Sequence, residues 1–126
     1  MTERISSGGP WEDAFGYSRA VRAGPFVFVS GCTATVDGHV VHPDDPYEQT
    51  VVAFGVAVTA LERAGFAIHD VVRTRMSVVS VDDCESVGRA HRAVFGDVRP
   101  AATMVVVAGL IDPAMRVEVE VDAFRD

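Results

Sequence analysis

The last apolar segment of the chain limits the fold more than any other feature. Over residues 117–122 the sequence reads Val-Glu-Val-Glu-Val-Asp, so valines alternate with carboxylates at a period of two. A strand with this pattern places its valines on one face of a sheet and its charges on the other. We therefore expect a sheet that buries one face under helices and leaves the other face uncovered by its own chain.

Two helices are expected to cover the apolar face. The first runs from Pro46 to Ala64: Asp45 is a suitable N-cap, Glu48 follows three residues later, and Gly65 suits the C′ position. Its apolar residues recur at spacings of three and four: Val51, Phe54, Val58 and Leu61.

The second helix is expected to begin at Asp82, with Glu85 completing a capping box, and to end near Gly96. Its inward stripe is Val87, His91, Val94 and Phe95. On this stripe His91 is expected to be a satisfied interior histidine.

The remaining apolar runs predict strands over 18–23, 26–30, 33–36, 40–41, 71–79, 102–108 and 116–124. Gly24-Pro25 and Asp37-Gly38 are the expected turns, and Val72, Thr74, Met76 and Val78 form the expected inward face of their strand. The order predicts an α+β fold, a two-layer sandwich of a mixed sheet with two helices on one face. We expect a single domain over 1–126, with 1–15 an N-terminal strand or loop, and an oligomer that covers the free sheet face.

Charge and composition exclude several classes of partner. Eleven basic and 18 acidic residues give a formal charge of −7, which disfavours nucleic acid and anionic membranes. The N-terminal residues do not resemble a signal peptide, and no apolar run reaches a membrane span. Cys32 and Cys84 lack a CxxC spacing, so we expect two reduced thiols and a cytoplasmic protein.

Six short segments follow one another along the chain: 16–20 (GYSRA), 28–31 (FVSG), 61–65 (LERAG), 70–73 (DVVR), 99–101 (RPA) and 117–120 (VEVE). In this order they resemble the Rid family of reactive intermediate deaminases, whose corresponding segments are G-P-Y-S-x-A, V-F-x-S-G, L-x-x-A-G, D-V-V-K, R-P-A-R and I-E-I-E. The resemblance covers 16–124. It implies a chorismate-mutase-like fold in a barrel-like homotrimer, with a small-molecule pocket at each subunit interface.

The resemblance also implies a reaction. Members of the family hydrolyse enamines and imines, such as 2-iminopropanoate, to keto acids and ammonia without a cofactor or metal. A carboxylate activates the water that adds to the imine carbon, and a guanidinium holds the substrate carboxylate. The positions that match are Glu118 as the catalytic carboxylate and Tyr17, Ser30 and Gly31 in the pocket.

Three positions depart from the family pattern. Ala102 stands where the family has the arginine of the pocket, Gly88 where deaminase members have an asparagine, and Met104 where a cysteine is common. Losing a charge-assisted contact costs about 1.5–3 kcal/mol, so turnover of 2-imino acids should be weak. Arg75 and Arg99 are the candidates for a replacement cation.

We therefore expect a hydrolase for an imine or enamine that need not carry an α-carboxylate, with the Ala102-Thr103 backbone lining a less polar pocket. The alternative is a non-catalytic binding or sensing trimer. An endoribonuclease or translation inhibitor is disfavoured by the net charge.

Each site residue also has a structural alternative. Glu118 could form a cross-strand ion pair with Arg73 or Arg75. Tyr17 and Ser30 could satisfy nearby backbone groups. Cys32 is expected to be a buried, inert thiol rather than a reactive one. His39 and His42 form an HxxH in a turn, and we expect no metal site there.

Overall fold

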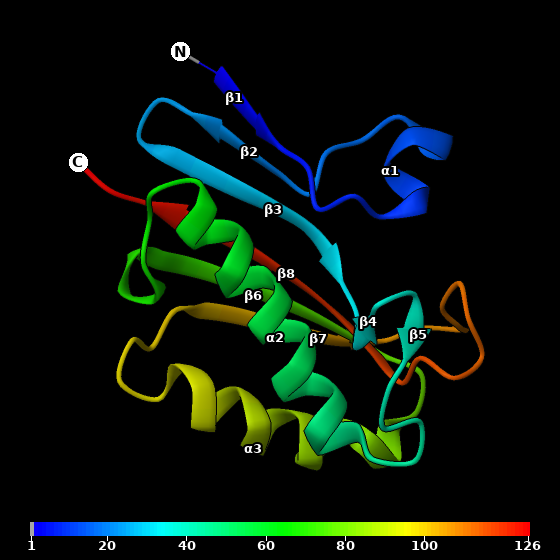
Figure 1. Cartoon of the computed structure of the whole chain (residues 1–126). Helices are drawn as coiled ribbons and strands as arrows, with labels where there is room; N and C mark the ends of the chain where they lie inside the picture. Colours follow the sequence, from blue (N-terminus) through cyan, green and yellow to red (C-terminus); the bar gives the residue numbers. More distant parts are fainter. Residues whose placement is uncertain (1) are drawn as a thin grey trace.

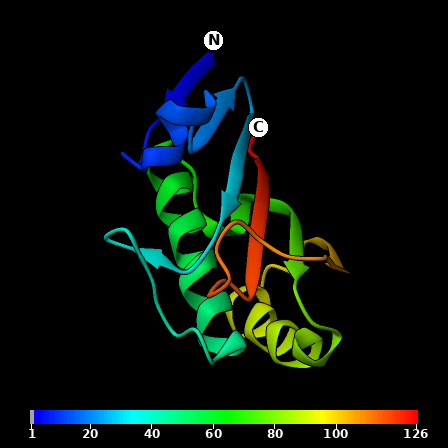
Figure 2. The same ribbon diagram turned by 90° about the vertical axis from the view of Figure 1, so that its right-hand side faces the viewer.

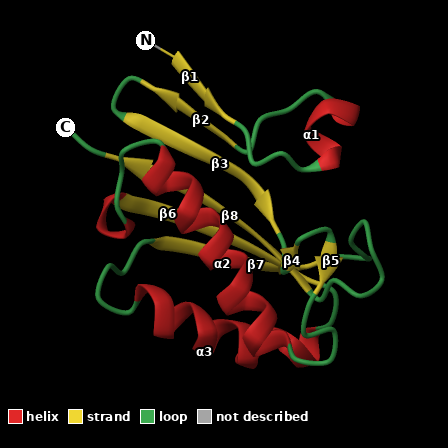
Figure 3. Cartoon of the chain, in the orientation of Figure 1, coloured by secondary structure: helices red, strands yellow, loops and turns green. Residues whose placement is uncertain are grey.

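The computed structural model describes residues 2–126 and places two long helices on one face of a mixed sheet (Figures 1 and 3). The strand order is β1-β2-β3-β8-β6-β7, and all neighbouring strands are antiparallel except β6 and β7. The elements are β1 (Thr2–Ile5), α1 (Pro10–Phe15), β2 (Ala20–Ala23), β3 (Phe26–Cys32), β4 (Thr35–Val36), β5 (His39–Val40), α2 (Pro46–Arg63), β6 (Val71–Val78), α3 (Cys84–Phe95), β7 (Ala101–Val106) and β8 (Val117–Phe124). Short 3₁₀ turns precede β6 (Ile68–Asp70) and α3 (Val81–Asp83).

The α+β architecture predicted from the sequence is confirmed. The Asp45 side chain caps α2 by accepting a hydrogen bond from the Glu48 amide at 3.1 Å. Both expected turns form hairpins: β2 pairs with β3, and β4 pairs with β5 in a small ribbon that projects from the sheet (Figure 2). Along β8 the valines are buried and the acidic residues face outward.

The core lies between the sheet and the two helices. Phe54 of α2 is fully buried and packs edge-on against Phe95 of α3, with ring centroids 4.9 Å apart. His91 lies between them, and its Nε2 is 2.8 Å from the Thr74 hydroxyl of β6. His91 is half-buried, and the Thr74 hydroxyl and the two rings satisfy it, as predicted. Burial lowers the pKa of His91.

Two local predictions are wrong because of contacts far along the chain. Val72 is 47% exposed and not inward, since a bulge between Val71 and Arg73 inserts one extra residue opposite β8. Asp83, not Asp82, occupies the N-cap position of α3. Its carboxylate accepts hydrogen bonds from Arg116 Nε and Nη2 at 3.1 and 3.0 Å.

Two further details differ from expectation. Residues 10–15 form the short helix α1, where the sequence analysis had a strand or loop over 1–15. On α2, Val51 and Val58 are only half-buried, because alanines at 53, 57 and 60 allow the helix to lie close to the sheet. Among residues 2–126, no helix is long and apolar enough to cross a bilayer.

The face of the sheet opposite the helices is uncovered in the single chain. Three aromatic side chains gather on it: Phe26 lies 5.8 Å from Phe28 and 5.1 Å from Phe124 between ring centroids. Beside them, Arg75 forms ion pairs with Asp122 at 3.1 Å and with Glu120 at 3.8 Å. This mixture of exposed rings and paired charges is typical of a surface that contacts another protein.

Candidate functional site

Glu118 lies over a bulge in the neighbouring strand. Between Val29 and Cys32, β3 contains one residue more than the β8 segment it pairs with. Gly31 lies in this bulge, and the Glu118 carboxylate folds over it: an ideal Cβ on Gly31 would be 2.7 Å from Glu118 Oε2. Only glycine leaves room for the carboxylate here. Bulges of this kind often place a side chain at an active site.

The surroundings of Glu118 suit a general base. Burial raises the pKa of Glu118, the like charge of Glu120 raises it further, and Arg19 partly opposes both. Among residues 2–126, no cationic side chain lies within 4.0 Å of the Glu118 carboxylate. The expected alternative of an ion pair with Arg73 or Arg75 is therefore wrong for this chain.

Arg19 is the residue that the sequence analysis missed. It is only 12% exposed, and its Nη1 donates hydrogen bonds to the Gly31 carbonyl at 2.5 Å and to Cys32 Sγ at 3.4 Å. Arg19 and Glu118 thus approach Gly31 from two sides. The available signal was its position inside the GYSRA segment, next to the expected pocket residue Tyr17.

Tyr17 and Ser30 lie near Arg19, in different roles. The Arg19 guanidinium is 5.8 Å from the centre of the Tyr17 ring, and Tyr17 lines a cavity of about 520 Å³ with Arg19 and Cys32. Ser30 Oγ donates to the Ser18 carbonyl at 2.7 Å, so its hydroxyl satisfies a backbone group. Tyr17 is thus open to a ligand, whereas Ser30 shapes the bulge.

The other four predicted pocket residues gather elsewhere. Gly88 of α3 faces Met104 of β7, whose Cε would be 3.9 Å from a Cβ on Gly88. Ala102 pairs with Thr74, whose side chain is buried on the helix side, so Ala102 points to that side and Thr103 to the open face. Since β6 separates β7 from β8, these residues lie about 10 Å or more from Glu118.

Neither expected replacement cation reaches Glu118. Arg75 is engaged by Asp122 and Glu120 on the open face. Arg99 lines a separate cavity at the end of α3, on the helix side of the molecule. Arg19 is therefore the cation that the chain itself brings closest to the Gly31 bulge.

Cys32 is buried, as predicted for an inert thiol. Cys32 is 2% exposed, and burial raises the pKa of its thiol although Arg19 lies beside it. The sequence had shown no basic neighbour for Cys32, and the fold supplies one. Within residues 2–126, no three His, Cys, Asp or Glu side chains gather as metal ligands would, and His39 and His42 lie on and after β5.

We expect Gly31→Ala to leave the fold intact and to displace the Glu118 carboxylate. The new Cβ would meet only the end of a flexible side chain, and the backbone of Gly31 does not require glycine. The displaced carboxylate would be better hydrated, so the pKa of Glu118 should fall. NMR titration of the side-chain carboxyl carbon measures it. Gly55→Ala, where a Cβ meets nothing within 4 Å, is the control. An unchanged pKa in Gly31→Ala would contradict the geometry.

Comparisons with known proteins agree with this fold. A family model described as endoribonuclease L-PSP matches residues 11–125. The chain is 48% identical over 122 residues to the uncharacterized protein SCO2049 of Streptomyces coelicolor, covering 97% of this chain and 91% of that one. It is similar to the crystal structure of Rv2704 from Mycobacterium tuberculosis, a member of the YjgF/YER057c/UK114 family, with a TM-score of 0.90, 42% identity and coverage of 99% and 100%. A putative endoribonuclease of Thermotoga maritima, TM0215, has a TM-score of 0.83 at 30% identity, covering 98% and 92%.

Proposed function

The chain belongs to the endoribonuclease L-PSP family, the YjgF/Rid family, and from this premise we propose that it hydrolyses a small imine or enamine at a pocket built around Glu118. The observation that carries the proposal is the Glu118 carboxylate, half-buried against Gly31, without a cationic partner within 4.0 Å among residues 2–126. A half-buried carboxylate without a cationic partner destabilises the fold, and carboxyl groups whose pKa is raised by burial are concentrated in active sites.

In the proposed reaction, Glu118 removes a proton from a water molecule as the water oxygen adds to the C=N carbon. The proton passes to the nitrogen and gives a carbinolamine. Glu118 then takes the proton of the new hydroxyl group and returns it to the amino nitrogen, so that the C–N bond breaks, the C=O bond forms, and ammonia leaves with a carbonyl compound as the second product. A raised pKa suits both steps, because the same group must accept and return a proton. The chemistry needs no cofactor, and Tyr17 lies where its ring could cover the substrate.

We propose that the working form is a homotrimer with the pocket between subunits. In one chain, Ala102 and Thr103 cannot meet Glu118, but β7 is a free edge of the sheet with exposed valines at 105 and 106. The edge of one copy could approach the Gly31 bulge of the next. The exposed rings of Phe26, Phe28 and Phe124 would be covered by the same assembly.

Ala102 is proposed to set the substrate class. A small apolar side chain cannot hold a carboxylate, so the preferred substrate is an imine without an α-carboxylate. We expect Ala102→Arg to raise hydrolysis of 2-imino acids about 10- to 100-fold, the effect of one charge-assisted contact. An amino-acid oxidase would generate the imines, and semicarbazide would trap those that survive. Ala101→Arg, one residue away and on the other side of the strand, is the control.

Each result of this assay distinguishes between the proposed functions. If the unmodified protein already competes with the trap for 2-imino acids, another cation replaces the family arginine. If only Ala102→Arg competes, the scaffold is catalytic and the native substrate lacks the carboxylate. If neither protein competes on any imine, the alternative of a non-catalytic binding or sensing trimer is favoured.

An RNA-cleaving function, which the family description and one relative's name suggest, is not favoured by the charges. The net charge is −7, and the open face presents the acidic residues 118, 120 and 122 in one row. A phosphate backbone would be repelled by this face.

A further inference from the structure

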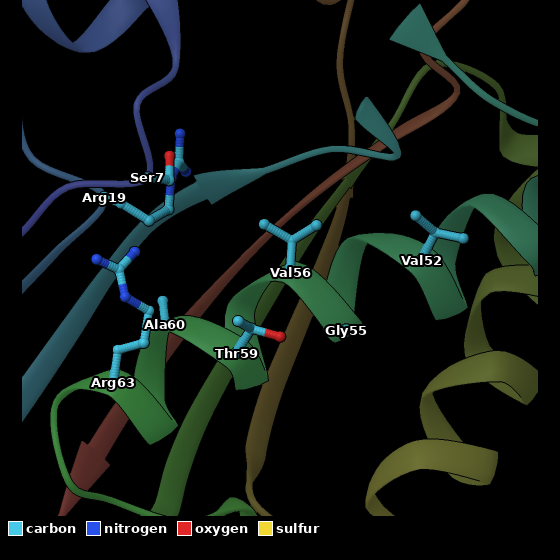
Figure 4. A pocket seen from close by; sticks show the side chains of 8 residues that line it. All are labelled: Ser7, Arg19, Val52, Gly55, Val56, Thr59, Ala60 and Arg63. Carbon is cyan, nitrogen blue, oxygen red and sulfur yellow. The ribbon is translucent and has the colours of Figure 1, made fainter. Parts of the chain in front are cut away.

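A groove on the outer side of α2 adjoins the Tyr17 cavity, with which it shares Ser7, Arg19 and Val56. It has a volume of about 420 Å³ and is lined on α2 by Val52, Gly55, Val56, Thr59, Ala60 and Arg63. Ser7 and Arg19 close one end. Figure 4 shows Arg19 and Arg63 near each other at that end, with the two valines along the helix away from them. The volume lies within the range of small-molecule sites.

The Arg63 guanidinium at this end has no carboxylate to balance it. Its Nη1 donates to the Ser6 carbonyl at 2.5 Å, and no carboxylate within residues 2–126 lies within 4.0 Å of Arg63. Arg19 has one carboxylate at 4.0 Å, Glu12 Oε2, and interacts with the Glu118 charge from farther away. The Arg19 Nε is buried and has no hydrogen-bond partner in the described structure. Arg63 therefore supplies the unbalanced positive charge of the groove, and the buried Arg19 Nε supplies a free donor.

Gly55 is a second observation that points to a ligand. It lies in the middle of an 18-residue helix, where glycine is less stable than alanine. Such a glycine usually allows a close approach of another element, but an ideal Cβ on Gly55 would meet nothing within 4 Å. The missing side chain therefore widens the floor of the groove between Val52 and Val56 without serving the packing of the chain.

We propose that this groove binds a monocarboxylate with an apolar tail, its carboxylate held by Arg63 and Arg19 and its tail lying over Val52, Gly55 and Val56. Charge complementarity selects the carboxylate, since guanidinium groups bind it in charge-assisted pairs. The half-buried valines select an aliphatic or aryl tail. Ser7, Arg19 and Val56 also line the Tyr17 cavity, whereas Val52, Gly55, Thr59, Ala60 and Arg63 line the groove and not that cavity.

Sodium octanoate is the probe, and octan-1-ol is its uncharged analogue. We expect saturable shifts of the amide NMR signals of α2 on titration with octanoate, and binding of octan-1-ol at least tenfold weaker. Arg63→Gln should weaken octanoate binding about tenfold or more, the value of a charge-assisted contact. Gly55→Leu should abolish it by filling the floor while raising the melting temperature of the protein. Arg89→Gln removes an exposed arginine of α3 and should leave the affinity for octanoate unchanged.

Absence of saturation at millimolar octanoate would overturn the proposal. Equal affinity in Arg63→Gln and Gly55→Leu would place the ligand elsewhere and overturn it too, and equal affinity for octan-1-ol would refute the role of the arginines. Glu118→Gln separates this proposal from the hydrolytic one: this variant should lose imine turnover if Glu118 is the base, whereas octanoate should still bind to it saturably and should still bind more weakly when Arg63→Gln is added.

Discussion

Glu118→Gln should reduce imine hydrolysis about 10²- to 10⁴-fold, the usual contribution of a general base. The amide fills the same space over Gly31 but cannot accept the proton of the attacking water. The change also removes a partly buried charge, so the fold should not suffer, and the mass of the assembly measured by light scattering should stay the same. Turnover of a carboxylate-free imine in the presence of semicarbazide measures the loss. Unchanged turnover would exclude Glu118 as the base.

The pH dependence tests the same role by a second route. The base must be ionised, so the rate should fall as the pH is lowered through the raised pKa of Glu118, above the ordinary glutamate value. Glu120→Gln removes the like charge that raises this pKa, so the acid limb of its profile should move to lower pH. Asp122→Asn, further along the same face, is the control. A limb that stays in place in Glu120→Gln would assign it to another group.

Much of this fold follows from signals that lie within a few residues of each other. Asp45 caps α2 with a group three residues away, and the Gly24-Pro25 turn joins two strands that are adjacent in sequence. The alternation of β8 is equally local, and it already implied that one sheet face would stay uncovered. For such features, the residues that form the sequence pattern are the same residues that make the contact in the structure.

The mistaken predictions depend on partners far along the chain. Val72 points outward because pairing with β8 creates a bulge, and no property of its own segment shows this. Asp82 was the predicted cap of the second helix, but a 3₁₀ turn over Val81–Asp83 precedes α3, and Asp83 takes the N-cap position without a side-chain cap hydrogen bond. The Asp83 carboxylate is bound instead by Arg116, 33 residues later, and no property of the local segment shows this pair.

The candidate site shows the same division. A short motif predicted Gly31 and Glu118 as pocket residues, and the fold brings them into contact. Arg19 stands at a variable position of its motif, and only the β3 bulge turns the Gly31 carbonyl toward it. Ala102 lies on the other side of the sheet from Glu118, so a single chain does not bring these two predicted pocket residues together.

Gln49 is a further case that no local pattern reveals, because a polar residue in the first turn of a helix is ordinary. It is fully buried, and its side chain makes three hydrogen bonds to backbone groups. The amide nitrogen donates to the carbonyls of Val41 at 3.1 Å and Ala114 at 2.9 Å, and the amide oxygen accepts from the Arg116 N–H at 2.8 Å. One side chain thus joins α2 to the segment that leads into β8 and Glu118.

Gln49→Leu should lower the free energy of unfolding by about 3–5 kcal/mol, because it leaves three buried backbone groups without hydrogen-bond partners. Each unpaired group costs about 1–3 kcal/mol, and water that enters the site offsets part of this cost. Urea denaturation measures the change, and Glu62→Ala on the exposed side of α2 should shift it by less than about 0.5 kcal/mol. A loss below about 1 kcal/mol would show that the 107–116 segment is held by other contacts. If the loss is as large as expected, the position of Glu118 depends on α2 as well as on the bulge beneath it, since Gln49 of α2 binds the Ala114 carbonyl and the Arg116 N–H directly before β8.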